Sequence, residues 1–452
     1  MSNAMPNARF SLDDDTLRTI VADALSRARE KGATEADAEV SEGYGQTVTV
    51  RKGTVETIEH NRDKGLGVSV MIGKQKGYAS TSDLTRKAIA DTVDAALSIA
   101  RFTAADDANG LADPDLLARP EDIRDLDLFH PWDISVEHAI QVARRCEAAA
   151  FRLDPRITNS EGATVSSQRT QFMFGTSAGF LGGYPSTRHF VSCSVIAQEG
   201  DAMQRDDWYS TSRSPSDLAK PAAIGDYAGR RALARLRSRK IATRETRVLL
   251  EAPLASGLLG HFVSAVSGGS LYRKASFLLN SLGTQVFSPI VNIREDPHRP
   301  RGQASTCFDD DGVLTRPRDV VRDGVLQGYF LGTYSARKLA MRSTGSAGGN
   351  HNLVLAPGDK DFVGMLREMG TGLLVTELMG QGINLVTGDY SRGAAGFWVA
   401  DGAIQYPVEE ITIAGNLRDM FRNIVAIGND MLARGSRECG SVLIDGMTVA
   451  GN

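Results

Sequence analysis

The stretch from residue 47 to residue 72, TVTVRKGTVETIEHNRDKGLGVSVMI, decides the fold of the N-terminal part of the chain. It contains three β-branched runs, at 47–50, 54–58 and 68–72, and a short segment with Lys followed by Gly lies between successive runs. Runs of β-branched residues separated by such turns are typical of neighbouring strands. The stretch therefore predicts a β-meander.

Helical patterns flank the meander on both sides. Apolar residues recur at helical spacing over 17–28 and again over 84–100, each time behind Ser and Asp residues that favour a helix start. The sequence therefore predicts an N-terminal α/β domain over 5–105, an α-β-β-β-α unit with its helices on one face of a sheet. Residues 1–4, MSNA, are interpreted as a tag scar outside the fold.

The rest of the chain divides by composition and apolar periodicity into three further segments. Residues 106–134 are rich in Asp, Pro and Leu without clear periodicity, and a linker is predicted there. A middle α/β domain is expected over 135–243; its predicted elements are helices at 135–152 and 217–240, strand-like segments over 156–200 and a polar loop at 201–215. A β-rich C-terminal domain with few helices is expected over 244–452, which makes the whole chain α+β. Its predicted elements include a helix at 254–267, ended by Gly268-Gly269, and strands at 383–386 and 408–413.

The composition argues against several classes of protein. The 452 residues carry 51 Lys+Arg against 55 Asp+Glu, a formal net charge of −4. This balance does not favour a nucleic-acid binder, because such proteins neutralise phosphates with excess basic residues. No apolar run reaches the roughly 18 residues of a membrane span, so we expect a cytoplasmic protein with neither a membrane nor a nucleic-acid partner. The four cysteines and seven histidines are dispersed, so neither a disulfide framework nor a closely spaced zinc motif is predicted.

Three local motifs invite a functional interpretation, and for each the structural interpretation is favoured. Gly175–Gly179 matches the G-x-S-x-G elbow of serine hydrolases, but the sequence after it does not favour the helix that the elbow requires. A Gly-rich turn is predicted there instead. Asp309–Gly312 lacks the alternating ligands of a calcium loop and predicts a solvated hairpin turn. The basic cluster at 230–240 is interpreted as a solvated helix end, with an anionic partner as the alternative.

His261 and Cys439 are the candidate metal-ligating residues. A zinc peptidase helix carries two histidines on one face and an adjacent glutamate that activates the zinc-bound water. The segment 258–265, LLGHFVSA, offers one histidine without a neighbouring glutamate, so an ordinary helix histidine is favoured. Cys439 is isolated, and such a cysteine is more typical of a small buried apolar residue than of a metal ligand.

The C-terminal part of the chain resembles the TldD/PmbA family. The segments that carry the resemblance are 382–398, GINLVTGDYSRGAAGFW, 406–417, YPVEEITIAGNL, and the ending 441–451, SVLIDGMTVAG. The segment 308–329 and the N-terminal α-β-β-β-α unit fit the same pattern. The resemblance therefore covers nearly the whole chain.

The resemblance implies a cytoplasmic, two-subunit metallopeptidase system that is also described as a modulator of DNA gyrase. In this family the TldD subunit carries an H-E-x-x-x-H helix and a distal cysteine that together bind zinc, and the second subunit, PmbA or TldE, lacks the histidines. Alignment with the TldD helix places Gly260 and Ala265 in the two histidine positions and His261 in the glutamate position. Cys439 falls at or near the position of the cysteine ligand. The resemblance thus implies a PmbA/TldE-type subunit with a degenerate metallopeptidase helix.

The leading hypothesis is a non-catalytic subunit of a TldD-type zinc metallopeptidase complex that acts on unfolded or leader peptides. It expects no cofactor in this chain, zinc only in a TldD-like partner, and a vestigial ligand position at Cys439. Whether the chain forms homodimers in isolation stays open. One alternative is a metallopeptidase, self-sufficient or completed by a partner, that uses His261 and Cys439. Another is a non-enzymatic modulator that binds proteins associated with DNA gyrase.

Overall fold

The chain is α+β, as predicted, and forms two compact units. The computed structural model describes residues 10–451, and the predicted tag scar at 1–4 lies outside them. Unit 1 extends to Leu233 and includes Cys307–Leu314; unit 2 holds Ala234–Thr306 and the chain from Thr315 onward.

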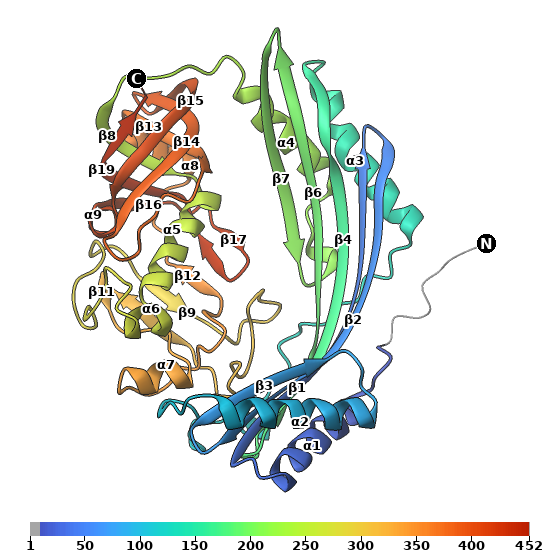
Figure 1. Cartoon of the computed structure of the whole chain (residues 1–452). Coiled ribbons are helices and arrows are strands. Elements are labelled where there is room, and N and C mark those ends of the chain that lie inside the picture. Colours follow the sequence, from blue (N-terminus) through green and yellow to red (C-terminus); the bar gives the residue numbers. More distant parts are fainter. Residues whose placement is uncertain (1–9, 452) are drawn as a thin grey trace. The chain divides into compact units, whose positions relative to one another are not determined.

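In the described residues, unit 1 consists of helices packed on one seven-stranded sheet (Figure 1). Its helices are α1 (Asp14–Glu30), α2 (Arg86–Phe102), α3 (Val136–Leu153) and α4 (Pro221–Ala234), with 3₁₀ turns at Pro120–Asp122 and Pro215–Asp217. Its strands are β1 (Glu35–Arg51), β2 (Thr54–Ile72), β3 (Gln75–Thr81), β4 (Ile157–Thr176), β5 (Leu181–Gly182), β6 (Pro185–Glu199) and β7 (Ala202–Ser212). The strand order is β3-β2-β1-β4-β6-β7, and β5 pairs with β4. The element order α1-β1-β2-β3-α2 confirms the predicted N-terminal unit. The predicted turn between the runs at 54–58 and 68–72 is wrong, because both runs lie in β2, and the third strand is β3.

Side chains cap the N-termini of the first two helices, at Asp13 and Thr85 and not at the serines that precede them. Asp13 accepts a hydrogen bond from the amide of Thr16 at the start of α1. Thr85, two residues after the predicted Ser82-Asp83 signal, caps α2 in the same way. These bonds satisfy amides that have no partner within the first helical turn.

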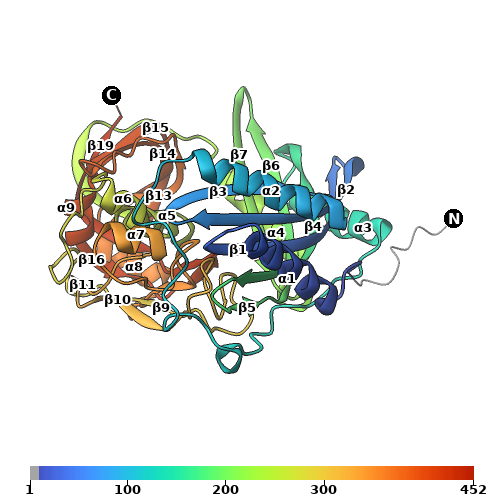
Figure 2. The same cartoon turned by 60° about the horizontal axis from the view of Figure 1, so that its bottom comes forward.

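One face of the sheet is apolar and carries the helices. Along β1 the buried apolar residues are Ala36, Ala38, Val40, Val48 and Val50. Their even spacing directs them to the same face of the sheet. Helices α1 and α2 pack on one part of that face and α3 on another, and Figure 2 shows α1 and α2 in front of β1, β2 and β3. This alternation is typical of an antiparallel sheet covered on one side.

The segments predicted as an N-terminal and a middle domain both contribute strands to this one sheet. β1 pairs antiparallel with β4 from Asp37↔Thr176 to Val50↔Ala163. The long pairing joins residues that are more than a hundred positions apart, so the two segments share a single apolar core layer. No local sequence pattern reports such a pairing.

The polar loop predicted at 201–215 is wrong, because most of it forms β7. This strand pairs with β6 from His189↔Ser212 to Glu199↔Ala202. Its buried positions carry polar residues, which concealed the strand: Asp206 is buried and forms an ion pair with Arg231 of α4 at 2.9 Å.

Unit 2 is built from two sheets and short helices. Its helices are α5 (Ala252–Ala265), α6 (Gly268–Tyr272), α7 (Thr333–Lys338), α8 (Phe362–Met369) and α9 (Leu417–Arg422). Its strands are β8 (Arg244–Leu250), β9 (Ile293–Glu295), β10 (Arg318–Arg322), β11 (Val325–Leu326), β12 (Leu353–Leu355), β13 (Gly372–Met379), β14 (Asp389–Ala400), β15 (Ala403–Asn416), β16 (Ile424–Ile427), β17 (Leu432–Arg434), β18 (Arg437–Cys439) and β19 (Val442–Ala450). The β-rich C-terminal part of the prediction is confirmed.

The larger sheet of unit 2 closes on itself. Its strand order is β15-β14-β13-β8-β19-β16, and β15 also pairs with β19. This extra pairing closes β15, β14, β13, β8 and β19 into a barrel, which leaves no free edge among these strands. The second sheet has the order β11-β10-β9-β12-β18-β17. Helix α5 packs against β13 of the barrel and against β17 and β18 of the second sheet, so it links the two.

Two predicted features of this unit are wrong. The segment 383–386 is a turn and not a strand, because Oδ1 of Asn384 accepts hydrogen bonds from the amides of Val386 and Thr387. The pair Gly268-Gly269 begins a helix, α6, behind Ser267. The predicted helix at 254–267 is present as α5, and the strand at 408–413 lies within β15.

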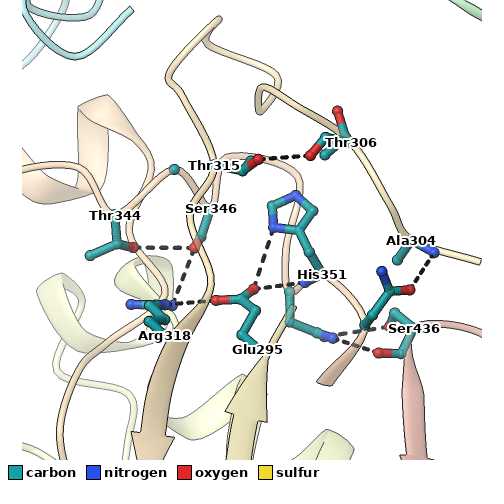
Figure 3. A network of polar contacts seen from close by, with 12 residues as sticks. Glu295, Ala304, Thr306, Thr315, Arg318, Thr344, Ser346, His351 and Ser436 are labelled. Atoms are coloured by element: carbon teal, nitrogen blue, oxygen red, sulfur yellow. Dashed lines mark hydrogen bonds and ion pairs between the residues drawn. The ribbon is translucent and has the colours of Figure 1, made fainter. Parts of the chain in front are cut away.

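A buried polar network ties β9, β10 and the segment just before β12 together (Figure 3). The carboxylate of Glu295 accepts hydrogen bonds from Nε of Arg318 at 2.7 Å and from the amide of His351 at 2.7 Å. Arg318 also donates to the carbonyl of Tyr329 at 2.8 Å. Burial alone would raise the pKa of Glu295, but the hydrogen bond from His351 and the charge of Arg318 hold it below its ordinary value. The network therefore keeps a buried carboxylate ionised.

No helix in residues 10–451 has both the length and the apolar character needed to cross a membrane.

Candidate functional site

Helix α5 positions three of the predicted site residues. It follows β8 directly, and its first turn contains Pro253. Proline is favoured there because it has no backbone N–H, and N–H groups of the first turn find no acceptor within the helix. The residues that face the core are Ala255, Leu258, Leu259, Phe262 and Ala265. Gly260 and His261 lie at the half-buried margin of this apolar stripe.

The side chain of Arg437 occupies the space in front of Gly260. A Cβ atom at Gly260 would fall against Nη1 of Arg437, well inside contact distance, and 3.1 Å from its Cζ. Nη1 of Arg437 donates a hydrogen bond to the carbonyl of Ser256 at 3.2 Å, one helical turn earlier. The guanidinium is thereby held on α5 beside Gly260, the residue that the family resemblance aligns with the first histidine of the zinc helix.

Ala265, the second histidine position, belongs to the apolar core. It is fully buried, and its carbonyl accepts a hydrogen bond from the hydroxyl of Ser276 at 2.6 Å. A polar ring at this position would have to enter the cluster around Phe262 and Leu331. The position therefore offers no ligand.

His261 is half-buried and uncharged at neutral pH. Burial lowers its pKa to about 4, and the positive charges of Arg392 and Arg437 act in the same direction. The imidazole meets the ring of Tyr390 edge to face, with 6.0 Å between the ring centroids. Arg392 and Tyr390 come from β14, so this strand, α5 and β18 together form the site.

Cys439 is a buried thiol. Its Sγ donates to the carbonyl of Ala252, at 3.5 Å, on the face of α5 that also contacts Arg437. Burial is the main reason that its pKa rises to about 12, and the charges of Asp430 and Glu438 add to the effect. At neutral pH Cys439 is therefore a neutral thiol.

These residues do not fit a zinc ion. A catalytic zinc needs about three protein ligands and an open position for water. Here Gly260 and Ala265 have no ligating atom, the Sγ atom of Cys439 contacts the carbonyl of Ala252, and the positively charged guanidinium of Arg437 lies between α5 and β18. Within residues 10–451, no group of three or more His, Cys, Asp and Glu side chains could hold a metal ion.

The sequence identified His261 and Cys439 but missed Arg392 and Arg437. A signal for Arg437 was present: it precedes Cys439 by two residues, and alternation along a strand directs both side chains to the same side. Arg392 lies in the 382–398 segment that carries the family resemblance, and nothing local distinguishes it from an exposed arginine.

The other motifs have structural roles. The G-x-S-x-G motif is a turn between β4 and β5, as predicted, and Oγ of Ser177 accepts a hydrogen bond from the amide of Ala36. Asp309–Gly312 is a hairpin turn, but Asp309 is buried and not solvated as predicted. Its Oδ1 accepts hydrogen bonds from the amides of Asp311 and Val313.

Unit 1 contains a separate hollow of about 630 Å³ on the helix-covered face of its sheet. Tyr44, Trp132, Arg169 and His189 are among its lining residues. Nε2 of His189 must carry the proton, because it lies 2.8 Å from the carbonyl oxygen of His130, which can only accept. None of the predicted site residues lines this hollow.

Comparisons with known proteins agree with this architecture. Models of PmbA/TldA metallopeptidases match three segments: domain 1 at 36–100, the central domain at 129–236 and the C-terminal domain at 243–451. The chain is 51% identical to Metalloprotease PmbA of Escherichia coli O157:H7 over 437 residues, which are 96% of this chain and 97% of the relative.

Solved structures show the same fold. The structure of a candidate modulator of DNA gyrase from Bacteroides thetaiotaomicron superposes with a TM-score of 0.92 at 28% identity, covering 97% of this chain and 100% of that one. TldE from Thermococcus kodakarensis superposes with a TM-score of 0.82 at 16% identity, covering 95% and 99%. The fold and the sequence match those of a metallopeptidase family. The chain belongs to the PmbA/TldA metallopeptidase family, which confirms the resemblance seen in its C-terminal segments.

Proposed function

We propose that this chain is the catalytically silent, PmbA/TldE-type subunit of a zinc metallopeptidase whose TldD-like partner holds the metal. The complex would act on unfolded or leader peptides in the cytoplasm. Family membership supports a role in proteolysis. The observation that carries the silent role is the guanidinium of Arg437 fixed against Gly260.

The charge and the position of Arg437 both oppose zinc binding. Two positive charges on zinc and one on a guanidinium, about 4 Å apart at an effective dielectric constant of 20, repel by about 8 kcal/mol. That repulsion is comparable to the binding free energies of about 10–16 kcal/mol that complete structural zinc sites reach. A site with an arginine in place of its first ligand and with an apolar second position would therefore bind zinc poorly.

In this proposal the chain holds the peptide beside the partner's metal and shields the bound peptide from bulk water. An extended peptide can be held through main-chain hydrogen bonds, which depend little on its side chains. Such binding suits unfolded segments of varied sequence. The partner would supply the zinc-bound water and the glutamate that activates it.

Metal analysis and peptidase assays test the proposal. The chain should be purified alone and together with a TldD-like chain from the same genome, and each preparation assayed for zinc and for cleavage of an unfolded protein. We expect zinc and cleavage only where the partner is present. Stoichiometric zinc together with cleavage by this chain alone would refute the silent role.

A variant separates this proposal from a zinc site completed by a partner. If Cys439 were a ligand, Cys439→Ala would abolish cleavage by the complex. We expect the complex to retain its activity and zinc content, because this thiol contacts the backbone of α5. Loss of zinc in this variant would favour the alternative that uses His261 and Cys439.

A further inference from the structure

Two arginines of the candidate site have no acidic partner. Arg392 of β14 and Arg437 of β18 are both half-buried, and in residues 10–451 neither forms an ion pair with a carboxylate. The Nε atom of each is buried without a hydrogen-bond partner. Arg437 lies against Gly260, the neighbour of His261. Arg392 follows Tyr390, whose ring meets His261, by two residues on the same side of β14. Both positive charges accordingly act on His261.

The acidic side chains near β18 are engaged elsewhere. Oδ1 of Asp430 accepts hydrogen bonds from the amide and the hydroxyl of Ser441, at 2.8 and 2.9 Å. Glu438 points to the opposite side of β18 from Arg437 and pairs with Arg299. Among the described residues, neither of these acids forms an ion pair with Arg392 or Arg437.

Uncompensated like charges at a half-buried site are unfavourable, and a bound anion would relieve them. Guanidinium groups bind carboxylates through short, charge-assisted hydrogen bonds, often two at a time. His261 beside them is neutral and adds no charge, but it can still donate or accept a hydrogen bond. The site thus has the charge and the donors for one carboxylate.

We propose that Arg392 and Arg437 form a carboxylate-binding site at the position where the catalytic subunit of this family holds zinc. The carboxylate comes from the C-terminus of a bound peptide or from an acidic side chain of the TldD-like partner. The biological identity of these two sources rests on the proposed function, whereas the presence of the anion site does not.

Binding of two matched peptides to the isolated full-length chain tests the site. The probes are N-acetyl-tetraalanine with a free C-terminal carboxylate and the same peptide with a carboxamide end, compared by titration calorimetry. We expect the free acid to bind at least tenfold more tightly than the amide. Arg392→Met and Arg437→Met should each weaken the free acid at least tenfold. Arg247→Met, which removes an exposed arginine paired with Asp445, should not weaken it.

The pKa of His261 gives a second readout. It would not change if Arg392 and Arg437 had only a structural role. A carboxylate between the two guanidinium groups offsets their charge, so the pKa of His261, followed by NMR with labelled histidine, should rise in the presence of the free acid and not of the amide. His261→Gln assigns the resonance. The wild-type comparison of acid with amide stands even if an arginine variant fails to fold.

Assembly with the TldD-like chain distinguishes the two sources. If the partner supplies the carboxylate, neither peptide binds the isolated chain, and Arg392→Met and Arg437→Met weaken assembly at least tenfold; this result supports the site. Equal affinity of acid and amide overturns it, as does the absence of peptide binding together with unchanged assembly. Zinc content and cleavage, measured separately, decide the proposed function whichever of these results is found.

Discussion

In the proposed function, Arg437 opposes zinc binding more directly than the missing histidines do. An absent ligand leaves a gap that a partner could fill. A guanidinium fixed between α5 and β18 fills that gap with positive charge, and its hydrogen bond to the carbonyl of Ser256 keeps it there. Gly260 permits this arrangement, because any side chain at that position would meet the guanidinium.

Replacement of Gly260 by alanine tests how firmly Arg437 is held. Gly→Ala in a helix interior ordinarily stabilises by about 0.5–1 kcal/mol. A Cβ atom at Gly257 on the same helix would have no neighbour within 4 Å, so Gly257→Ala should raise the free energy of unfolding by that amount. Gly260→Ala should gain less stability than Gly257→Ala or none, because the guanidinium of Arg437 must move away from the new methyl group and give up its hydrogen bond to Ser256, a loss of about 0.5–1.5 kcal/mol. Urea denaturation measures both.

A double variant supplies the control. In an Arg437→Ala background the space in front of Gly260 is free, so Gly260→Ala should become stabilising by up to about 1 kcal/mol. If Gly260→Ala and Gly257→Ala stabilise alike in the wild-type chain, Arg437 is not held against the helix.

At the scale of elements, a small residue sets the distance between α3 and α4. A Cβ atom at Gly225 of α4 would overlap the carbonyl oxygen of Cys146 in α3 and lie 2.8 Å from its carbonyl carbon. A helix backbone cannot move aside as the end of a flexible side chain can. The two helices therefore pack at this distance only because position 225 has no side chain.

Gly225→Ala should consequently destabilise unit 1. We expect a loss of about 1–3 kcal/mol through overpacking, even though alanine is the better helix former. The control is Ala223→Ser on the exposed side of the same helix, which should change stability by no more than about 0.5 kcal/mol. Urea denaturation compares them, and equal stability of the two variants would contradict the close approach of α3 and α4.

The Glu295 network predicts how the stability of unit 2 depends on pH. The folded state holds the pKa of this carboxyl below the ordinary value of 4.5. Its contribution to stability is therefore fully present above pH 4.5 and is lost as the pH falls through the lower, folded-state pKa. Glu295→Gln should remove this contribution and lower the free energy of unfolding by about 3 kcal/mol, because it leaves the partly buried Arg318 without its charged partner.

The control for Glu295 is an exposed ion pair. Asp445 and Arg247 are 3.3 Å apart with about half of each side chain exposed, and Asp445→Asn should cost less than about 1 kcal/mol. Denaturation at pH 7 and at stepwise lower pH measures both variants. If the free energy of unfolding of the Glu295→Gln chain falls with pH below 4.5 as steeply as that of the wild-type chain, the network does not control stability in acid.

Local patterns predicted the elements well where apolar residues mark the buried face and poorly where polar residues do. Helices α1, α2, α3 and α5 were predicted because apolar stripes define them. Strand β7 was missed because Gln204 and Asp206 occupy buried positions in it. The segment 383–386 looked like a strand, but the side chain of Asn384 bends it into a turn. In these cases side-chain hydrogen bonds outweighed residue propensity.

At the scale of the whole molecule, the sequence could not predict which distant segments pair. The β1–β4 pairing and the β15–β19 pairing that closes the barrel depend on register between separated strands, and no local period encodes it. The residues of the candidate site likewise divide into those that the sequence predicts and those that only the fold brings together. His261 and Cys439 were found by their chemistry, whereas Arg392 and Arg437 acquire their role only when β14 and β18 meet α5.

The charge distribution of the whole molecule opposes DNA binding, although the basic cluster at 230–240 initially suggests an anionic partner. Carboxylates within the same unit neutralise most of the cluster. Its ion pairs are Arg230–Asp226 at 2.7 Å, Arg231–Asp206 at 2.9 Å, Arg235–Glu377, and Lys240–Glu410 at 2.8 Å. Arg239 instead lies over the ring of Tyr406, 3.4 Å from its centroid.

With a net charge of −4 and a paired basic cluster, the chain should release few counterions on contact with DNA. Each phosphate that a protein neutralises adds about −0.9 to the slope of log K against log salt. A filter-binding titration with duplex DNA should therefore show no saturable binding between about 50 and 200 mM salt, the range over which such contacts are usually compared. The double variant Asp226→Asn, Glu410→Gln removes the partners of Arg230 and Lys240. If these ion pairs are what prevents DNA binding, the variant should bind DNA more strongly than the wild-type chain at low salt. Tight wild-type binding with a steep salt slope would contradict this account and favour a direct role on DNA.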